Sequence, residues 1–229
     1  LLRAAASLEA QKFKDFEWII MPNGKVELPD VSKLPNCRII EPSDKNSKVI
    51  GLLKGECCDV AKGNVLVELD HDDELTPDCL EELHKAFSDI SVDFCYSNCA
   101  ELDSKLEPHY YSSAFGWKDR PFIYNGRIIK EQLSFHPTAA SFSKIWVAPN
   151  HVRAWRRSFY DKIIGYDKSM DVLDDQDILS RTYIHGNVKF IDKCLYIYYR
   201  HEGNTCYGDK NKFIQTETLN IHDKYIYQL

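Results

Sequence analysis

The sequence has no run of about 18 consecutive apolar residues, which is the shortest length of helix that crosses a bilayer. Its first residues do not combine a basic stretch with a following apolar one, so the sequence predicts no secretory signal peptide. It also has no segment rich in Gly, Ser or Pro that would divide it, and no internal repeat. We therefore expect a single domain over residues 1–229, with no transmembrane segment.

An excess of positive charge is also absent. The 29 Lys and Arg residues are outnumbered by 35 Asp and Glu residues, which gives a formal net charge of -6, so we expect no nucleic-acid partner. The eight cysteines include no Cys-x-x-Cys pair of the kind that binds zinc, and Cys57 and Cys58 are adjacent. Because a chain of 229 residues does not depend on disulfide staples, we interpret them as mostly free thiols and predict a reducing, cytoplasmic location.

The sequence does contain an alternation of strand-like and helix-like segments. Short β-forming runs such as FEWIIM, NVLVELD and VDFCYS alternate with longer stretches of helical character. One predicted helix, VIGLLKGECCDVAKG, has Gly63 as its C-terminal stop, and another begins at Thr76 as N-cap with Pro77 in the first turn. This order predicts an α/β fold with an open, mixed, mostly parallel sheet flanked by helices. Residues 103–137 show no pattern that assigns them to elements.

Three aspartates, Asp70, Asp72 and Asp73, follow directly after the strand-like run VLVEL. In open α/β sheets ligands bind outside the carboxyl ends of the strands, so the position itself indicates a site. A solvated turn that caps the next helix would explain one or two carboxylates, and a calcium loop is disfavoured because Leu75 stands where glycine is needed. A divalent cation that bridges a diphosphate is the third interpretation, since Mg²⁺ and Mn²⁺ prefer hard oxygen ligands. An Asp-x-Asp is a weak motif by itself, so the neighbouring segments decide.

A second acidic pair, Asp174 and Asp175, lies in MDVLDDQDILSRTYIHG, which has the character of a helix. At helical spacing Asp174 and Asp177 share a face, whereas Asp175 points elsewhere. The pair can act as a general base, or it can be an acidic helix start that the helix dipole stabilises. The pattern alone leaves both interpretations open.

Taken in order, four stretches of the chain resemble the family 2 glycosyltransferases, which have the GT-A fold, a Rossmann-like α/β fold. KDFEWIIMPNG is similar to that family's second strand, and VIGLLKGECCDVAKGNVLVELDHDD to its helix, turn, strand and Asp-x-Asp in unbroken succession. RRSFYDKIIGYDKSMDVLDDQDILSRTYIHG resembles the segment that carries the family's paired acids, and YRHEGNTC resembles its run after the last core strand. Two features depart from the family: the sequence starts inside the helix that follows its first strand, and Pro22 and Asn23 replace an aspartate.

The resemblance implies that the chain binds a nucleotide-sugar donor together with a divalent cation, Mn²⁺ or Mg²⁺. Residues 1–100 would form the nucleotide-binding part, residues 101–206 the acceptor and catalytic part, and residues 207–229 a C-terminal helical segment. The metal ligands that the resemblance implies are Asp72, Asp70 and His201. The residues expected to contact the nucleotide are Asn23, Lys54, Asp70, His71 and Arg200.

The implied reaction is an inverting transfer of a sugar from a nucleotide-sugar, most simply a UDP-sugar, to a glycan or another hydroxyl acceptor. In the family the second acid of the pair takes the proton of that hydroxyl, which assigns the base to Asp175, with Asp174 as the alternative. Two other functions remain open. A strand followed by Asp-x-Asp also resembles haloacid-dehalogenase-like phosphatases, although Glu74 stands where they have Thr or Val. A catalytically idle domain that binds a nucleotide or carbohydrate would keep the sheet without the base.

Overall fold

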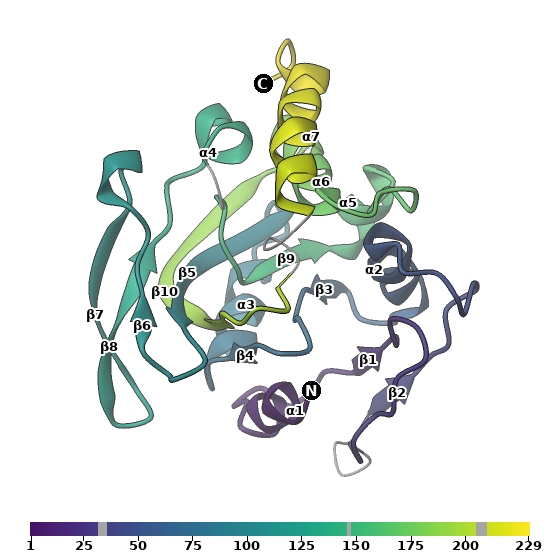
Figure 1. Cartoon of the computed structure of the whole chain (residues 1–229), viewed down its shortest axis with the longest axis vertical. Helices are drawn as coiled ribbons and strands as arrows, with labels where there is room; N and C mark the ends of the chain where they lie inside the picture. The colour runs from purple at the N-terminus through teal and green to yellow at the C-terminus, as the bar shows by residue number, and fades with distance from the viewer. Residues whose placement is uncertain (32–35, 146–147, 205–209) are drawn as a thin grey trace.

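The computed structural model describes residues 1–31, 36–145, 148–204 and 210–229. It has a two-stranded sheet and a larger, curled mixed sheet, with helices on both sides (Figure 1). The strands are β1 (Trp18–Ile20), β2 (Cys37–Ile39), β3 (Val65–Val67), β4 (Glu74–Leu75), β5 (Phe94–Leu102), β6 (Pro108–His109), β7 (Lys118–Tyr124), β8 (Arg127–Leu133), β9 (Arg153–Arg156) and β10 (Val188–Tyr199). The helices are α1 (Leu2–Glu9), α2 (Ile50–Val60), α3 (Cys79–Phe87), α4 (Ala139–Ser143), α5 (Arg157–Lys162), α6 (Asp174–His185) and α7 (Lys210–Tyr225), with a short 3₁₀ turn at Ser113–Phe115.

In the large sheet the strands are ordered β3-β9-β5-β10-β4. The directions of these strands decide which strand ends lie together along one side of the sheet, here called the edge. Strand β10 is parallel to β5, whereas β9 is antiparallel to both β5 and β3. Strands β3, β5 and β10 therefore run in the same direction, and their carboxyl ends point to the same edge. The predicted mixed sheet is confirmed, although β9 and the β7–β8 hairpin give it more antiparallel pairing than the sequence indicated.

The central strand β5 is buried along its whole length and separates two apolar layers. Successive side chains of a strand point to opposite faces. Phe94 and Tyr96 accordingly pack in one cluster with residues of α5 and α6, whereas Cys95 and Cys99 pack in another with residues of α1 and α3. The continuous burial explains why the run VDFCYS reads as an apolar strand rather than as an alternating one.

Several element boundaries differ from the sequence predictions. Helix α2 ends at Val60 with the next residue already extended, so Gly63 is not its stop. Helix α3 starts at Cys79, so Thr76 is not its N-cap. The Thr76 hydroxyl donates to Asp78 Oδ1 (3.0 Å), and the Thr76 carbonyl accepts from the backbone N–H of Cys79. The predicted C-terminal helix is present as α7.

The unassigned stretch 103–137 contains a β-hairpin, β7–β8, whose turn is made by Asn125 and Gly126. Both residues have positive φ, 48° and 75°, as a two-residue turn of type I′ requires. Asn-Gly was therefore a usable hairpin signal, but the surrounding charged and aromatic residues do not alternate clearly enough to reveal the strands.

No helix in the described ranges combines the length and the apolar character that crossing a membrane requires.

Candidate active site

The candidate site forms at the edge where β3, β5 and β10 end (Figure 1). After β3 the chain crosses this edge as the turn 68–73 and then enters β4, which pairs with β10 on the far side of the sheet. Strand β10 ends at Tyr199 and leads into Arg200 and His201 at the same edge. Because β9 runs antiparallel, its first residue Arg153 also lies here.

Asp73 is the buried anchor of the acidic turn. Its Oδ2 accepts a hydrogen bond from the Tyr196 hydroxyl (2.8 Å), and its Oδ1 accepts one from the backbone N–H of Tyr199 (2.8 Å). The Tyr196 oxygen also accepts from the backbone N–H of Asp70 (3.1 Å). Burial, with the nearby charge of Asp70, raises the pKa of Asp73 to about 8. Asp73 therefore fixes the turn to β10 and does not reach solvent.

Asp72 and His201, two of the predicted metal ligands, lie side by side. Asp72 Oδ2 lies 2.6 Å from His201 Nε2. His201 Nδ1 accepts from the backbone N–H of Gly203 (3.1 Å), and this contact holds the ring with Nε2 toward Asp72. The backbone N–H of His201 in turn donates to Asn204 Oδ1 (2.6 Å). A carboxylate oxygen and an imidazole nitrogen thus face each other across a short gap.

The third predicted ligand does not complete a cluster with this pair. Among the residues that the structure describes, no group of three or more His, Cys, Asp or Glu side chains is arranged to hold a metal ion. Asp70 instead is close enough to Lys54 and Asp73 to raise the pKa of each. His71 is largely exposed, with Nδ1 3.6 Å from Asp72 Oδ1. The candidate metal-binding side chains are therefore those of Asp72 and His201, with Asp70 beside them.

Lys54 joins the acidic turn to the second acidic pair. It projects from α2, and its Nζ lies 2.5 Å from Glu68 Oε1 and 3.3 Å from Asp174 Oδ2. Burial disfavours the charge of Lys54, but Asp174 and Glu68 outweigh that cost and hold the pKa of Lys54 well above its usual value. Asp70 adds to this effect. One partly buried ammonium group thus lies among carboxylates from the turn 68–73 and from α6.

The two acids at the start of α6 have different surroundings. Asp174 is 4% exposed, and burial raises its pKa to about 6 despite the opposing charge of Lys54. The Asp175 side chain is 34% exposed, and its Oδ2 accepts from Arg153 Nη1 (3.0 Å). Burial alone would raise the pKa of Asp175, but Arg153 and Lys54 reverse the sign and lower it. As the helical spacing predicted, Asp174 and Asp177 are buried whereas Asp175 faces outward.

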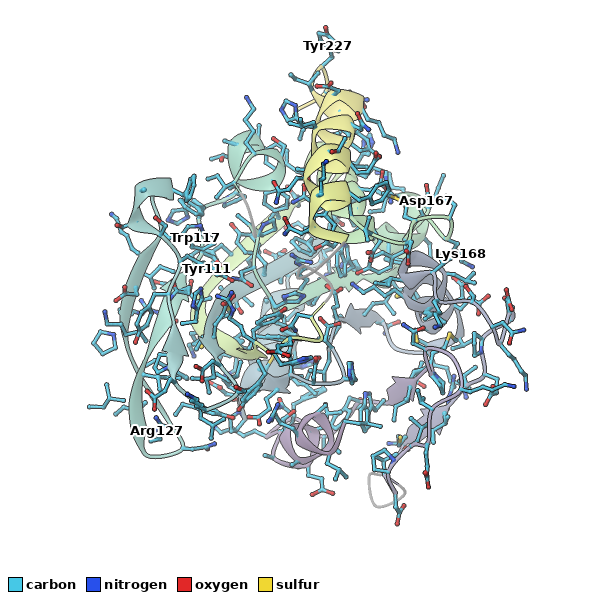
Figure 2. The ribbon with its side chains drawn as sticks, in the orientation of Figure 1. Tyr111, Trp117, Arg127, Asp167, Lys168 and Tyr227 are labelled. Carbon is cyan, nitrogen blue, oxygen red and sulfur yellow. The ribbon has the colours of Figure 1, made fainter. Side chains whose placement is uncertain are left out.

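Arg200 lies at the edge, with its guanidinium directed at a buried acid. Its Nη1 is 3.6 Å from Glu101 Oε2. Glu101 also accepts a hydrogen bond from the Tyr111 hydroxyl, and Asn150 Nδ2 donates to the same hydroxyl oxygen (2.9 Å). Burial raises the pKa of Glu101 to about 7. Tyr111 packs edge-on against Trp117, 4.7 Å away, on the side of the β7–β8 hairpin (Figure 2).

Asn23 stands apart from these clusters. It is exposed in the turn after β1. Its neighbours Pro22 and Gly24 line a hollow of about 600 Å³ together with Lys25 and Glu41. The structure thus brings together Asp70, Asp72, His201, Lys54, Asp174 and Asp175. Arg200 follows β10 at the same edge but pairs with Glu101, and His71 is exposed beside Asp72. Asn23 lies apart from them.

Two residues of this edge were missed by the sequence reasoning, Glu68 and Arg153. Glu68 lies between two basic side chains, because its Oε1 contacts Lys54 and its Oε2 is 3.7 Å from Arg153 Nη1. Oε2 is also 3.6 Å from His151 Nε2. A signal existed for each, because a charged residue stands inside an apolar β-forming run in both VLVELD and VRAW. Such a charge is costly to bury unless it is paired, and it therefore marks a buried partner.

The chain matches the model of the family described as Glycosyl transferase family 2 over residues 1–163. Its fold is similar to that of TarS from S. aureus. TarS 1-349 in complex with UDP-GlcNAc superposes with a TM-score of 0.66 at 13% identity, covering 99% of this chain and 68% of that one. TarS 1-349 in complex with UDP gives a TM-score of 0.61 at 12% identity, covering 98% of this chain and 61% of that one.

TarS 1-349 in a further crystal structure gives a TM-score of 0.64 at 14% identity, covering 86% of this chain and 56% of that one. The chain therefore spans little more than half the length of that structure. Among curated proteins no sequence matches it. Since the family model covers well over half of the residues, the chain belongs to glycosyl transferase family 2.

Proposed function

We propose that the chain transfers a sugar from a UDP-sugar to a hydroxyl group of a glycan or glycoconjugate, with inversion and with the help of a divalent cation. The observation that carries the proposal is the arrangement at the sheet edge. Asp72 and His201 meet there, and Lys54 links Asp70 and Glu68 to the acid pair of α6. The likeness to TarS bound to UDP-GlcNAc supports the choice of UDP-linked donors.

The residues present fit Mn²⁺ or Mg²⁺. Asp72 offers a carboxylate oxygen and His201 an imidazole nitrogen at the same point, with the Asp70 carboxylate nearby. Mn²⁺ accepts such a mixed set, and both ions keep coordination positions for phosphate oxygens. When bound, the cation would neutralise the charge that builds on the departing diphosphate.

Asp175 is the base in this proposal. Its side chain is the more exposed of the pair, so an acceptor hydroxyl can reach it, and Arg153 keeps it ionised. The hydroxyl oxygen forms the new bond to the anomeric carbon while its proton passes to Asp175. The bond from that carbon to the phosphate oxygen breaks, and its electron pair leaves with UDP. Asp174 is too buried for this role and serves to hold Lys54.

The direct test measures UDP release from a panel of UDP-sugars with Mn²⁺ and a mixture of acceptor glycans. We expect Asp72→Ala and Asp175→Asn each to lower kcat/KM by at least about 100-fold, corresponding to roughly 3 kcal/mol of lost transition-state stabilisation. Asp161→Asn, an exposed acid on α5, is the matched control and should keep wild-type activity. Full activity in both site variants would overturn the assignment.

The remaining alternatives predict other results. An idle binding domain would be stabilised by UDP with Mn²⁺ and would turn over no donor. The phosphatase alternative has lost its basis, because the family and the fold are those of glycosyltransferases. A cytoplasmic location belongs to the same proposal and is supported by Cys37, Cys57, Cys58, Cys79, Cys95, Cys99 and Cys194, which are free thiols in the described residues.

A further inference from the structure

Asp177 is a buried carboxylate in the first turn of α6, three residues after Asp174. It is 1% exposed. Its Oδ2 accepts from Arg181 Nε (2.9 Å) and Nη2 (2.5 Å) on the same helix. Its Oδ1 accepts from Lys224 Nζ (2.7 Å) and the Tyr225 hydroxyl (2.6 Å), both at the end of α7. Four donors from two helices therefore converge on one acid that does not itself face the candidate site.

The same two helices also meet through an apolar contact next to the acid pair. The two residues before Asp174, Val172 and Leu173, are buried in one cluster with Ile214, Ile221 and Tyr225 of α7. Leu173 has φ of 60°, a left-handed conformation that is strained for a residue with a side chain. Packing by α7 thus holds the strained residue from which α6 starts, directly before Asp174 and Asp175.

The polar contact is better explained by orientation than by stability alone. A buried ion pair contributes little over a well-packed apolar contact, because desolvation offsets the attraction. Its geometry is specific, however, since each oxygen of Asp177 is assigned to one helix. A rotation of α6 that broke these bonds would also move Asp175 away from Arg153 and Asp174 away from Lys54.

We propose that Asp177 is a positioning residue, through which α7 fixes the rotation of α6 and so aims Asp175 at the acceptor. The inference rests on the proposed function in that Asp175 is taken as the base. In the chain α7 follows His201 after residues 202–209, so one segment leads from the expected metal ligand to the helix that orients the acid pair. The C-terminal helix thereby becomes part of the catalytic architecture without touching substrate.

The variant that tests this is Lys224→Met, because the Lys224 side chain is 52% exposed and its loss should leave the fold intact. Hydrogen exchange of residues 170–180 reports on the start of α6, independently of turnover. We expect exchange there to be about tenfold faster, with the rest of the molecule unchanged. We also expect kcat with the donor to fall about tenfold while the KM for the donor stays within about twofold, since a small misplacement of a base impairs the chemical step.

Two further variants separate positioning from general stability. Lys224→Arg keeps the charge and should recover most of the protection and the kcat. Lys212→Met removes an exposed lysine from the same helix and should behave as wild type. Wild-type exchange at residues 170–180 in Lys224→Met, or faster exchange there with an unchanged kcat, would overturn the inference. If the wild type turns over no donor, the proposed function fails, and the exchange of residues 170–180 alone then decides whether α7 holds α6.

Discussion

At the scale of single residues, the hydroxyl of Tyr196 holds the acidic turn at two points. It donates to Asp73 Oδ2 and accepts from the backbone N–H of Asp70. Asp70 and Asp72 repel each other, so a turn that carries both needs such a fixed backbone. His151 stacks on the Tyr196 ring with centroids 4.8 Å apart, which keeps the ring from turning. The positions of Asp70 and Asp72 thus depend on Tyr196, which does not itself offer an atom to the cation.

Replacing Tyr196 by Phe keeps the ring and removes the hydroxyl. We expect the free energy of unfolding to fall by about 1–3 kcal/mol, because Asp73 and the Asp70 N–H each lose a buried partner. Urea unfolding measures the change. Tyr183→Phe is the control, since it keeps the ring contact with Phe142. Equal stability of the two variants would contradict the anchoring role of Tyr196.

Glu101 gives a prediction about pH. Burial raises its pKa to about 7 in the folded chain, whereas an unfolded chain titrates glutamate near 4.5. The folded state therefore binds more protons between these values, and the free energy of unfolding falls as the pH rises from about 4.5 to 7. We expect Glu101→Gln, which retains an acceptor for Tyr111, to remove this loss, worth up to about 3 kcal/mol.

The measurement is the melting temperature of wild type and Glu101→Gln from pH 5 to pH 8. The difference, variant minus wild type, should grow with pH and level off above about pH 7. Glu107→Gln controls for the general loss of one carboxylate, at an exposed position nearby. A difference for Glu101→Gln that stays constant across the range would be inconsistent with a titration near 7.

The sequence predicted that the acidic turn carries a site, but it could not predict where each of its side chains points. Asp72 and Asp73 are adjacent and chemically identical, yet one faces His201 and the other is buried under Tyr199. The alternation of a strand ends where the chain turns, so no period assigns faces to residues 70–73. Helical spacing did separate Asp174 from Asp175, because that segment is regular. Glu68 and Arg153 were missed, since their roles come from partners that lie far from them in the sequence, Lys54 or Asp175.

At the scale of elements, α2 owes its position to two glycines, Gly51 and Gly55, that face the loop before α6. The backbone N–H of Gly51 donates to the carbonyl of Met170 (2.9 Å). A Cβ at Gly51 would lie 2.2 Å from the Asp167 carbonyl oxygen, whereas one at Gly55 would meet only the flexible side chain of Lys168. Figure 2 shows Asp167 and Lys168 on this loop, beside α2.

We therefore expect Gly51→Ala to destabilise the protein by about 1–3 kcal/mol, as overpacking does elsewhere. Alanine gains up to about 1 kcal/mol of helix propensity over glycine, so the contact with backbone must outweigh that gain. Activity should fall as well, because Lys54 lies on the same helix and contacts Asp174. Thermal unfolding and UDP release measure the two effects.

Two alanine variants serve as controls for Gly51→Ala. Gly55→Ala should be mild, because the Lys168 side chain can move aside, and Gly63→Ala should be close to neutral, because its Cβ would lie 3.4 Å from the Val65 carbonyl oxygen. The order Gly51, Gly55, Gly63 is thus a graded prediction. A Gly51→Ala variant as stable as wild type would show that the loop yields without cost.

The sequence predicted regular elements well and their pairing poorly. The strand and helix order up to residue 100 was confirmed except for the two-residue strand β4, because each predicted element is a short apolar or amphipathic run. The antiparallel insertion of β9 was not foreseen, since its partners β3 and β5 lie far away in the sequence. The β7–β8 hairpin was missed because its exposed face mixes Ile123 and Ile128 with charged residues, which obscures a period of two.

At the scale of the whole molecule, the site is an effect of topology. Residues 54, 72, 153, 175 and 201 come from five separate parts of the chain, and the shared direction of β3, β5 and β10 brings them to one edge. Motif order along the sequence was enough to indicate such a site, because the fold places its segments in a fixed way. The distances that distinguish Asp174 from Asp175 required the structure.

Variants in the two halves of this edge should separate nucleotide binding from the chemical step. Asp72 belongs to the half that would hold the cation and diphosphate, and Asp175 to the half that meets the acceptor. A ligand at about 100 times its Kd stabilises the folded state by about 2.7 kcal/mol, which raises Tm by roughly 5–10 °C for a chain of this size. We expect wild type and Asp175→Asn to show this rise with UDP and Mn²⁺, and Asp72→Ala to show little of it.

Differential scanning fluorimetry with UDP alone, Mn²⁺ alone and both together measures the effect, and EDTA should abolish it. Asp175→Asn should then bind as the wild type does but release UDP at least about 100-fold more slowly, because an amide cannot accept the proton of the acceptor. The argument depends on the asymmetry between the variants. If Asp175→Asn lost the nucleotide-dependent rise while Asp72→Ala kept it, the roles assigned to the two halves of the edge would have to be exchanged.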